Sequence, residues 1–177
     1  MIKKFMLLTI AAFALVACGD DDPEVIDNPQ DTKYTKLVST AKMQFSADLI
    51  RIADITIYYM KEGGEVAHEI VADSVWENSV TQTIPCQTGM AITYSVKPEL
   101  NLSAEDKFDL SHSGKFTITP YTEKGQAGAA NLHTITKSSK GVNGDKVAEL
   151  LSRRSVNIGY TYTTDGKCDT TNIEWGF

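Results

Sequence analysis

The sequence is poor in the residues that usually carry catalysis or hold a transition metal. It has only three histidines and three cysteines in 177 residues. The histidines, His68, His112 and His133, show no His-x-x-x-His spacing, and no Cys-x-x-Cys pair is present. Because a zinc site normally shows such spacing, we expect no metal site and no cofactor, and we interpret the histidines as surface or loop residues.

Nucleophile motifs are missing as well. The chain has no Gly-x-Ser-x-Gly sequence, which would place a serine on the strained turn of a hydrolase. A serine and a histidine are adjacent at Ser111-His112, but adjacency in a loop does not set a base against a nucleophile. We therefore expect a protein without catalytic residues, and a small secreted-type hydrolase with an unrecognised site is kept as an alternative.

Positive charge is also scarce. Seventeen Lys and Arg residues stand against 23 Asp and Glu residues, which gives a formal net charge of −6. A nucleic-acid-binding protein needs a basic surface to displace the counterions of the phosphates. The composition therefore predicts no nucleic-acid partner.

No hydrophobic run is long enough for an ordinary membrane-spanning helix. The longest uninterrupted one near the start, Phe5 to Ala17, is shorter than the roughly 20 residues that such a helix needs. It follows Lys3 and Lys4 and ends at small residues, which is the layout of a secretory signal peptide. We expect residues 1–17 to be removed.

The segment Leu15-Val16-Ala17-Cys18 resembles the lipobox of bacterial lipoproteins. The resemblance implies that Cys18 is lipidated and becomes the first residue of the mature chain. The following Gly19-Asp20-Asp21-Asp22 is similar to the surface-export signal of Bacteroidetes lipoproteins; it also reads as a solvated acidic spacer. We expect a flexible tether over residues 18–31 and a lipid anchor in the outer membrane, with the domain exposed at the cell surface or, alternatively, facing the periplasm.

The remaining residues, 32–177, predict one domain that is all-β and mainly antiparallel. Several segments alternate apolar and polar residues with the period of a strand, among them 90–96, 116–119 and 156–162. Asp165-Gly166 predicts a hairpin turn, and so does Gly63-Gly64. One inserted short helix is predicted over 144–154 from the spacing of its apolar residues. We expect an immunoglobulin-like or related β-sandwich, with a barrel as the alternative.

Two cysteines remain after Cys18, and a compartment outside the cytoplasm allows disulfides to persist. Cys86 and Cys168 are therefore a candidate disulfide. The parity of the apolar residues Ile173, Trp175 and Phe177 argues against it, because an unbroken strand would turn Cys168 outward. Both states of the two thiols stay open.

Binding requires only exposed side chains on a rigid scaffold. Tyr58, Tyr121 and Trp76 are candidate ligand-binding aromatics, since exposed rings can stack on sugars, although each could instead cover a core. An acidic loop between Glu99 and Asp109 could hold calcium or simply form a capped turn, and the second interpretation is favoured. We expect a non-catalytic binding or assembly module for a glycan or an envelope protein. A fimbrial or adhesin-like subunit is a further alternative, which would need an exchangeable edge strand.

Overall fold

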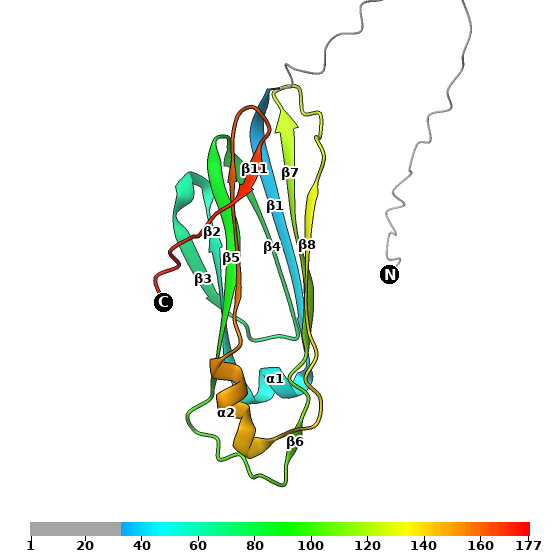
Figure 1. Ribbon diagram of the computed structural model, residues 1–177, viewed down its shortest axis with the longest axis vertical. Coiled ribbons are helices and arrows are strands. Elements are labelled where there is room, and N and C mark those ends of the chain that lie inside the picture. The colour runs from blue at the N-terminus through cyan, green and yellow to red at the C-terminus, as the bar shows by residue number, and fades with distance from the viewer. Residues whose placement is uncertain (1–32) are drawn as a thin grey trace, which may run out of the picture.

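The computed structural model describes residues 33–177, which form two packed β-sheets capped at one end by helices (Figure 1). The predicted signal peptide at 1–17, the lipidation site Cys18 and the tether at 18–31 lie outside the described residues. All buried residues of the two hydrophobic clusters fall between Leu37 and Trp175. The described residues therefore bury a hydrophobic core among themselves.

Eleven strands, two α-helices and one 3-10 helix follow each other along the described chain. In order they are β1 (Tyr34–Phe45), α1 (Ala47–Ile52), β2 (Ala53–Met60), η2 (Glu62–Gly64), β3 (Val66–Ile70), β4 (Val75–Thr83), β5 (Cys86–Val96), β6 (Lys107–Phe108), β7 (His112–Thr122), β8 (Asn131–Lys137), β9 (Val142–Asn143), α2 (Gly144–Ser152), β10 (Val156–Tyr162) and β11 (Cys168–Thr170).

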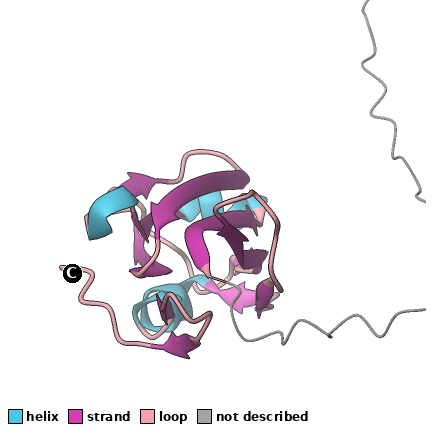
Figure 2. Ribbon diagram, turned by 90° about the horizontal axis from the view of Figure 1, so that it is seen from above, coloured by secondary structure: helices cyan, strands magenta, loops and turns pink. Residues whose placement is uncertain are grey.

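The two main sheets are antiparallel throughout. The four-stranded sheet has the order β4-β1-β7-β8, and the five-stranded sheet has the order β11-β10-β5-β2-β3. A view along the long axis shows the strands arranged around a common interior (Figure 2). The predicted all-β sandwich is confirmed. Its strand order could not be read from the sequence, because strands that pair here, such as β1 and β7, are far apart along the chain.

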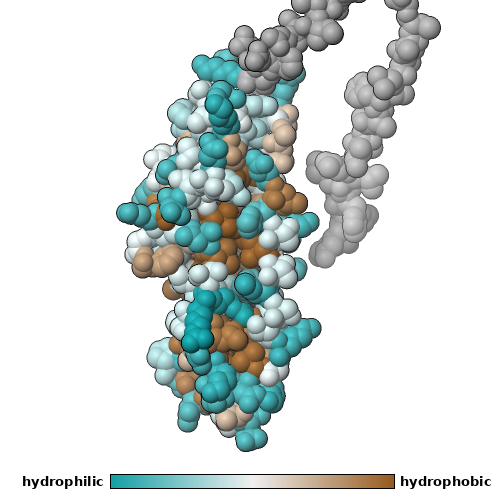
Figure 3. All heavy atoms as spheres, in the orientation of Figure 1, coloured by the Kyte–Doolittle hydropathy of each residue, from teal (hydrophilic) through white to brown (hydrophobic). Residues whose placement is uncertain are grey.

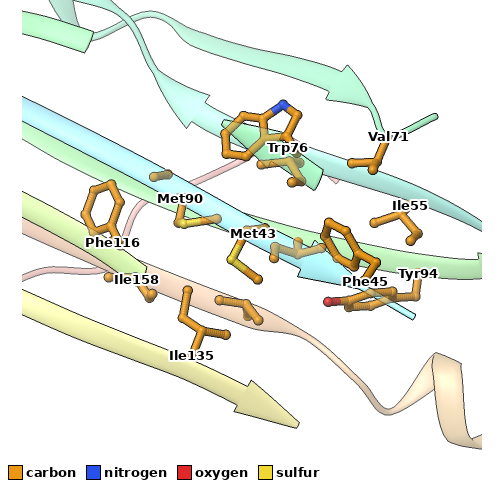
Figure 4. Packing of buried hydrophobic residues seen from close by; sticks show 14 of the residues in the cluster. Met43, Phe45, Ile55, Val71, Trp76, Met90, Tyr94, Phe116, Ile135 and Ile158 are labelled. Atoms are coloured by element: carbon orange, nitrogen blue, oxygen red, sulfur yellow. The ribbon is translucent and has the colours of Figure 1, made fainter. Parts of the chain in front are cut away.

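The core fills the space between the sheets, and period-two alternation produces it. In β1 the odd-numbered residues from Leu37 to Phe45 point inward and the even-numbered ones point to solvent. Met43 of β1 and Met90 of β5 lie near the centre of the packed group, with Phe116 and Ile135 from the four-stranded sheet beside them (Figure 4). Each of the two sheets thus contributes one face to a shared core.

The apolar stretch over residues 49–60 begins within a helix and not within a bent strand. The mixed phase before Asp54 predicts a bend or bulge near Ala53, but residues 47–52 form α1 and β2 begins at Ala53. Ser46 caps this helix, with its side chain accepting a hydrogen bond from the Leu49 amide at 3.3 Å. Leu49 and Ile52 are buried at helical spacing, which explains why their parity did not fit a strand.

The predicted helix at 144–154 is confirmed as α2, Gly144–Ser152, and it buries Val147 and Leu151. Both α-helices lie at the same end of the sandwich (Figure 1). Both predicted hairpins form, with Gly63 and Gly166 at positive φ in their turns. The second hairpin returns for three residues only, Cys168–Thr170, because the chain then leaves the sheet edge.

Residues 171–177, which we call the C-terminal strap, cross the outer face of the five-stranded sheet (Figure 1). Gly89 and Gly159 are register partners on β5 and β10, and the side chain of Ile173 lies over both. Trp175 donates a hydrogen bond from Nε1 to Oδ1 of Asn157 at 2.8 Å. Ile173 and Trp175 form a second, smaller core with Met60 and Ala91, so the strap covers part of this face of the sheet.

Hydrophobic residues at the surface show as two patches in the space-filling view, one at mid-height and one near the helical end, each framed by hydrophilic residues (Figure 3). The exposed large hydrophobic residues belong to separate elements: Ile70, Val75, Leu100, Leu132 and Phe177. Among residues 33–177, no helix has the length and apolar character needed to cross a membrane.

Candidate binding face on the four-stranded sheet

The aromatic residues proposed from the sequence do not form one site. Tyr58 lies on the outer face of the five-stranded sheet, under the C-terminal strap. Its ring is 5.7 Å from that of His68 and 4.8 Å from that of Phe177, and it packs against the second core. Tyr58 thus covers a core, which was the alternative to ligand binding for this residue.

Tyr121 and Trp76 are placed in two further environments. Tyr121 is half-buried on the outer face of the four-stranded sheet, with the Nζ atom of Lys36 6.0 Å from its ring centre. Trp76 is a core residue between the sheets, and its Nε1 donates to Oε2 of Glu69 at 2.7 Å. Tyr58 and Tyr121 lie on opposite faces of the sandwich, so the candidate aromatic residues do not line one common groove.

The two remaining cysteines are free thiols. In the register of the five-stranded sheet, Cys86 pairs with Tyr162 from one side and Cys168 pairs with Tyr162 from the other. Two strand spacings amount to roughly 9–10 Å, beyond the roughly 7 Å that a disulfide can bridge between Cα atoms. The candidate disulfide is therefore not formed. Burial raises the pKa of the Cys86 thiol to about 11, which makes it a poor nucleophile.

Each histidine lies beside a tyrosine, and the hydrogen bonds of the described histidines involve neither a serine nor a carboxylate. His112 is buried, with Nδ1 3.0 Å from the hydroxyl of Tyr94. His133 is exposed, with Nδ1 3.5 Å from the hydroxyl of Tyr160. The structure thus corrects the interpretation of His112 as a surface residue. It offers no base-and-nucleophile pair to the hydrolase alternative within residues 33–177.

The acidic loop forms a turn. Ser103 accepts a hydrogen bond from the Glu105 amide through Oγ, and its own amide donates to Oδ2 of Asp106 at 3.3 Å. In the part of the chain that the structure describes, no group of three or more potential metal ligands comes together. The carboxylate of Asp106 is therefore used in local capping.

The outer face of the four-stranded sheet is a regular grid of polar side chains, and we call it the polar face. The register aligns the outward residues in rows across β4, β1, β7 and β8. The rows are Thr83-Lys36-Tyr121, Thr81-Val38-Thr119, Ser79-Thr40-Thr117-Leu132, Glu77-Lys42-Lys115-Thr134 and Val75-Gln44-Ser113-Thr136. Hydroxyl side chains dominate the grid, and its residues are exposed or half-buried. The rows thus present donors and acceptors at strand spacing.

Two shallow hollows lie on the polar face. One, of about 540 Å³, lies over Thr40, Ser79 and Thr117; the other, of about 330 Å³, lies over Ser113, Thr134 and Thr136. Lys42 and Lys115 line both hollows. The two lysines therefore lie between the two hollows. A ligand lying across the strands would contact both hollows and both lysines.

The sequence did not indicate this face, because single threonine, serine and lysine residues in a strand carry no functional signal. Alternation within β1 shows that Lys36, Thr40, Lys42 and Gln44 point outward, and β7 shows the same for its own residues. Only the pairing of β1 with β7, more than 60 residues apart along the chain, places Thr40 beside Thr117 and Lys42 beside Lys115. A single sequence does not contain that register.

No protein-family model matches the chain, and neither a curated protein nor a solved structure matches it.

Proposed function

We propose that this chain is a lipid-anchored lipoprotein of the outer membrane, exposed at the cell surface, whose sandwich is a non-catalytic binding module. In this proposal Cys18 carries the lipid and residues 18–31 hold the domain away from the membrane. The lipobox resemblance of Leu15 to Cys18 supports the anchor.

One observation favours the polar face as the binding surface: the two outer faces of the sandwich differ in how far other parts of the chain cover them. The C-terminal strap covers part of the outer face of the five-stranded sheet with Ile173 and Trp175. The polar face presents exposed threonines, serines and lysines around two hollows. A rigid sheet holds these side chains in fixed positions, which lowers the entropy cost of binding.

Glycans are the partner class that this surface fits. Threonine and serine hydroxyls both donate and accept hydrogen bonds, as sugar hydroxyls do. The hollows are shallow and open, which suits a chain lying across the strands. An envelope protein is the other partner class, and it would need aromatic or apolar anchors, of which this grid has four among its many hydroxyl residues: Val38, Val75, Tyr121 and Leu132.

The test is a glycan-array and pull-down screen with the soluble chain from Thr32 onward. Changing Thr40 and Thr117 together to Gln fills the larger hollow without altering charge, and we expect at least about tenfold weaker binding to any glycan that the screen identifies. Changing Thr56 and Thr93 to Gln is the matched control, since these threonines are cross-strand partners on the outer face of the other sheet. Equal binding by both double variants would exclude the polar face, and capture of only a protein partner would exclude the glycan.

A further inference from the structure

The polar face contains a pair of like charges that costs stability. Lys42 on β1 and Lys115 on β7 are direct register partners and point to the same side of the sheet. Like charges directly opposite each other on neighbouring strands are destabilising. Lys42 pairs with Glu77 on its other side, whereas Lys115 forms no ion pair within residues 33–177. The pair leaves a net positive charge between the two hollows.

The charge of the polar face is opposite to that of the molecule. The chain has a net charge of −6, but the grid of the polar face contains Lys36, Lys42 and Lys115 against the single carboxylate of Glu77. A surface whose sign differs from that of the whole protein attracts ligands of the other sign to one place. The polar face therefore selects for an anion.

The surroundings of the two lysines narrow the chemistry of that anion. Hydroxyls flank them along the strands at Thr40 and Thr117 and beside β7 at Thr134. An acidic peptide would gain its main affinity by pairing its backbone with a sheet edge, but the main chains of β1 and β7 are already paired on both sides. An anionic lipid surface would use the lysines alone and leave the hollows and hydroxyls without a role.

We infer that Lys42 and Lys115 form the anion-binding subsite of the polar face and that its ligand is an acidic polysaccharide. The inference rests on the proposed function. A carboxylate on one sugar accepts hydrogen bonds from the two ammonium groups, and the neutral hydroxyls of adjacent sugars contact the threonines on either side. The like-charge pair then becomes favourable in the complex, because the ligand supplies the missing negative charge.

The test measures binding of the soluble chain from Thr32 onward to polygalacturonate, with neutral dextran as the uncharged probe. Lys115→Gln and Lys42→Gln are each expected to weaken polygalacturonate binding roughly tenfold, the effect of losing one charge-assisted hydrogen bond. Lys146→Gln on α2 removes the same charge at the helical end and should change nothing. Glu77→Gln removes the competing carboxylate and should strengthen binding by about two- to fivefold, because an exposed ion pair is worth less than about 1 kcal/mol.

Several results would overturn the inference. Equal affinity for dextran and polygalacturonate, or unchanged affinity in both lysine variants, would show that the lysine charges do not contribute to ligand binding. Binding to phosphatidylglycerol vesicles but not to polygalacturonate would assign the lysines to a membrane. If the lysine variants bind normally while the Thr40 and Thr117 double variant does not, the polar face binds a neutral glycan: this inference fails and the proposed function stands. If the double variant also binds normally, both fail.

Discussion

At the residue scale, His112 shows what burial does to a titratable group. It is 2% exposed, its ring stacks on that of Tyr94 at 5.5 Å, and its Nε2 is buried without a hydrogen-bond partner among the described residues. Burial, together with the positive charges of Arg154 and Lys137, lowers the pKa of His112 to about 4. The guanidinium of Arg154 is itself fixed by hydrogen bonds to the Leu110 carbonyl and to Oγ of Ser139.

This arrangement predicts acid sensitivity. The unfolded chain binds a proton at the ordinary histidine pKa of about 6.5 and the folded chain does so only near pH 4, so stability is complete above about pH 6.5 and falls as the pH drops toward 4. The loss amounts to about 3 kcal/mol. Urea unfolding of the wild type and of His112→Gln at several pH values measures it: the variant should show a flatter profile in this window. Parallel profiles for the two proteins would contradict the assignment to His112.

A second residue-scale prediction concerns the glycine pair under the strap. A Cβ built on Gly159 would lie 2.4 Å from the Thr171 carbonyl oxygen and 3.0 Å from Ile173. Since the nearest atom is backbone, relief requires movement of the strap, and we expect Gly159→Ala to lower the free energy of unfolding by about 2–3 kcal/mol. Ser95→Ala, an exposed position on β5, should stay within about 0.5 kcal/mol of the wild type in the same denaturation experiment.

At the element scale, the C-terminal strap is a non-strand segment that stabilises a sheet from outside. Ile173 is 8% exposed and Trp175 is 6% exposed, whereas Phe177 is 64% exposed. Trp175 also holds Asn157 through its indole hydrogen bond. The buried part of the strap is therefore concentrated in two side chains.

The strap predicts a graded series of stabilities. Trp175→Ala should cost about 3 kcal/mol, because it removes a buried ring and a hydrogen-bond donor, and Ile173→Ala should cost about 2 kcal/mol. Phe177→Ala should cost well under 1 kcal/mol, because its side chain is mostly in water. Thermal or chemical denaturation of the three variants checks the order. A Phe177 variant that is as unstable as the Trp175 variant would show that the strap is seated differently.

Elements whose signal is local were predictable. Alternation identified the strands at 90–96, 116–119 and 156–162, the Asp165-Gly166 turn identified the last hairpin, and the spacing of Val147 and Leu151 identified α2. Local signals failed where the phase changed within one apolar run, as at α1. They also failed where residues 171–177 left strand geometry after Thr170, because Ile173 and Trp175 keep a strand-like parity in a segment that crosses the strands.

The candidate site was much less predictable than the fold. Tyr58, Tyr121 and Trp76 were selected as single aromatic residues, yet Tyr58 and Tyr121 lie on opposite faces of the sandwich and Trp76 lies in its core. The candidate site on the polar face exists only when several side chains lie together: Lys42, Lys115, Thr40 and Thr117. Their proximity depends on the long-range register between β1 and β7. Function that resides in a flat face is thus harder to find in one sequence than function that resides in a motif.

At the scale of the whole molecule, the proposal of a lipid anchor depends on a single residue. We expect Cys18→Ser to prevent lipidation and to release the chain from the membrane fraction, because several buried acyl chains are what make such an attachment stable. Incorporation of labelled palmitate and separation of membrane and soluble fractions measure the effect. Cys86→Ser is the matched control and should remain membrane-bound and labelled. Membrane retention of an unlabelled Cys18 variant would show that something other than the lipid holds the chain.

The position of β1 has a mechanical consequence. β1 is 12 residues long and lies between β4 and β7, antiparallel to both. A force applied to the N-terminal end of the domain and directed along β1 loads the hydrogen bonds on both sides of the strand in shear. Under shear the bonds share the force and do not break one after another. A domain held at this end while its polar face grips a polymer in flowing liquid would therefore resist being unravelled, and its lifetime under tension would be governed by the rate of unfolding rather than by its equilibrium stability.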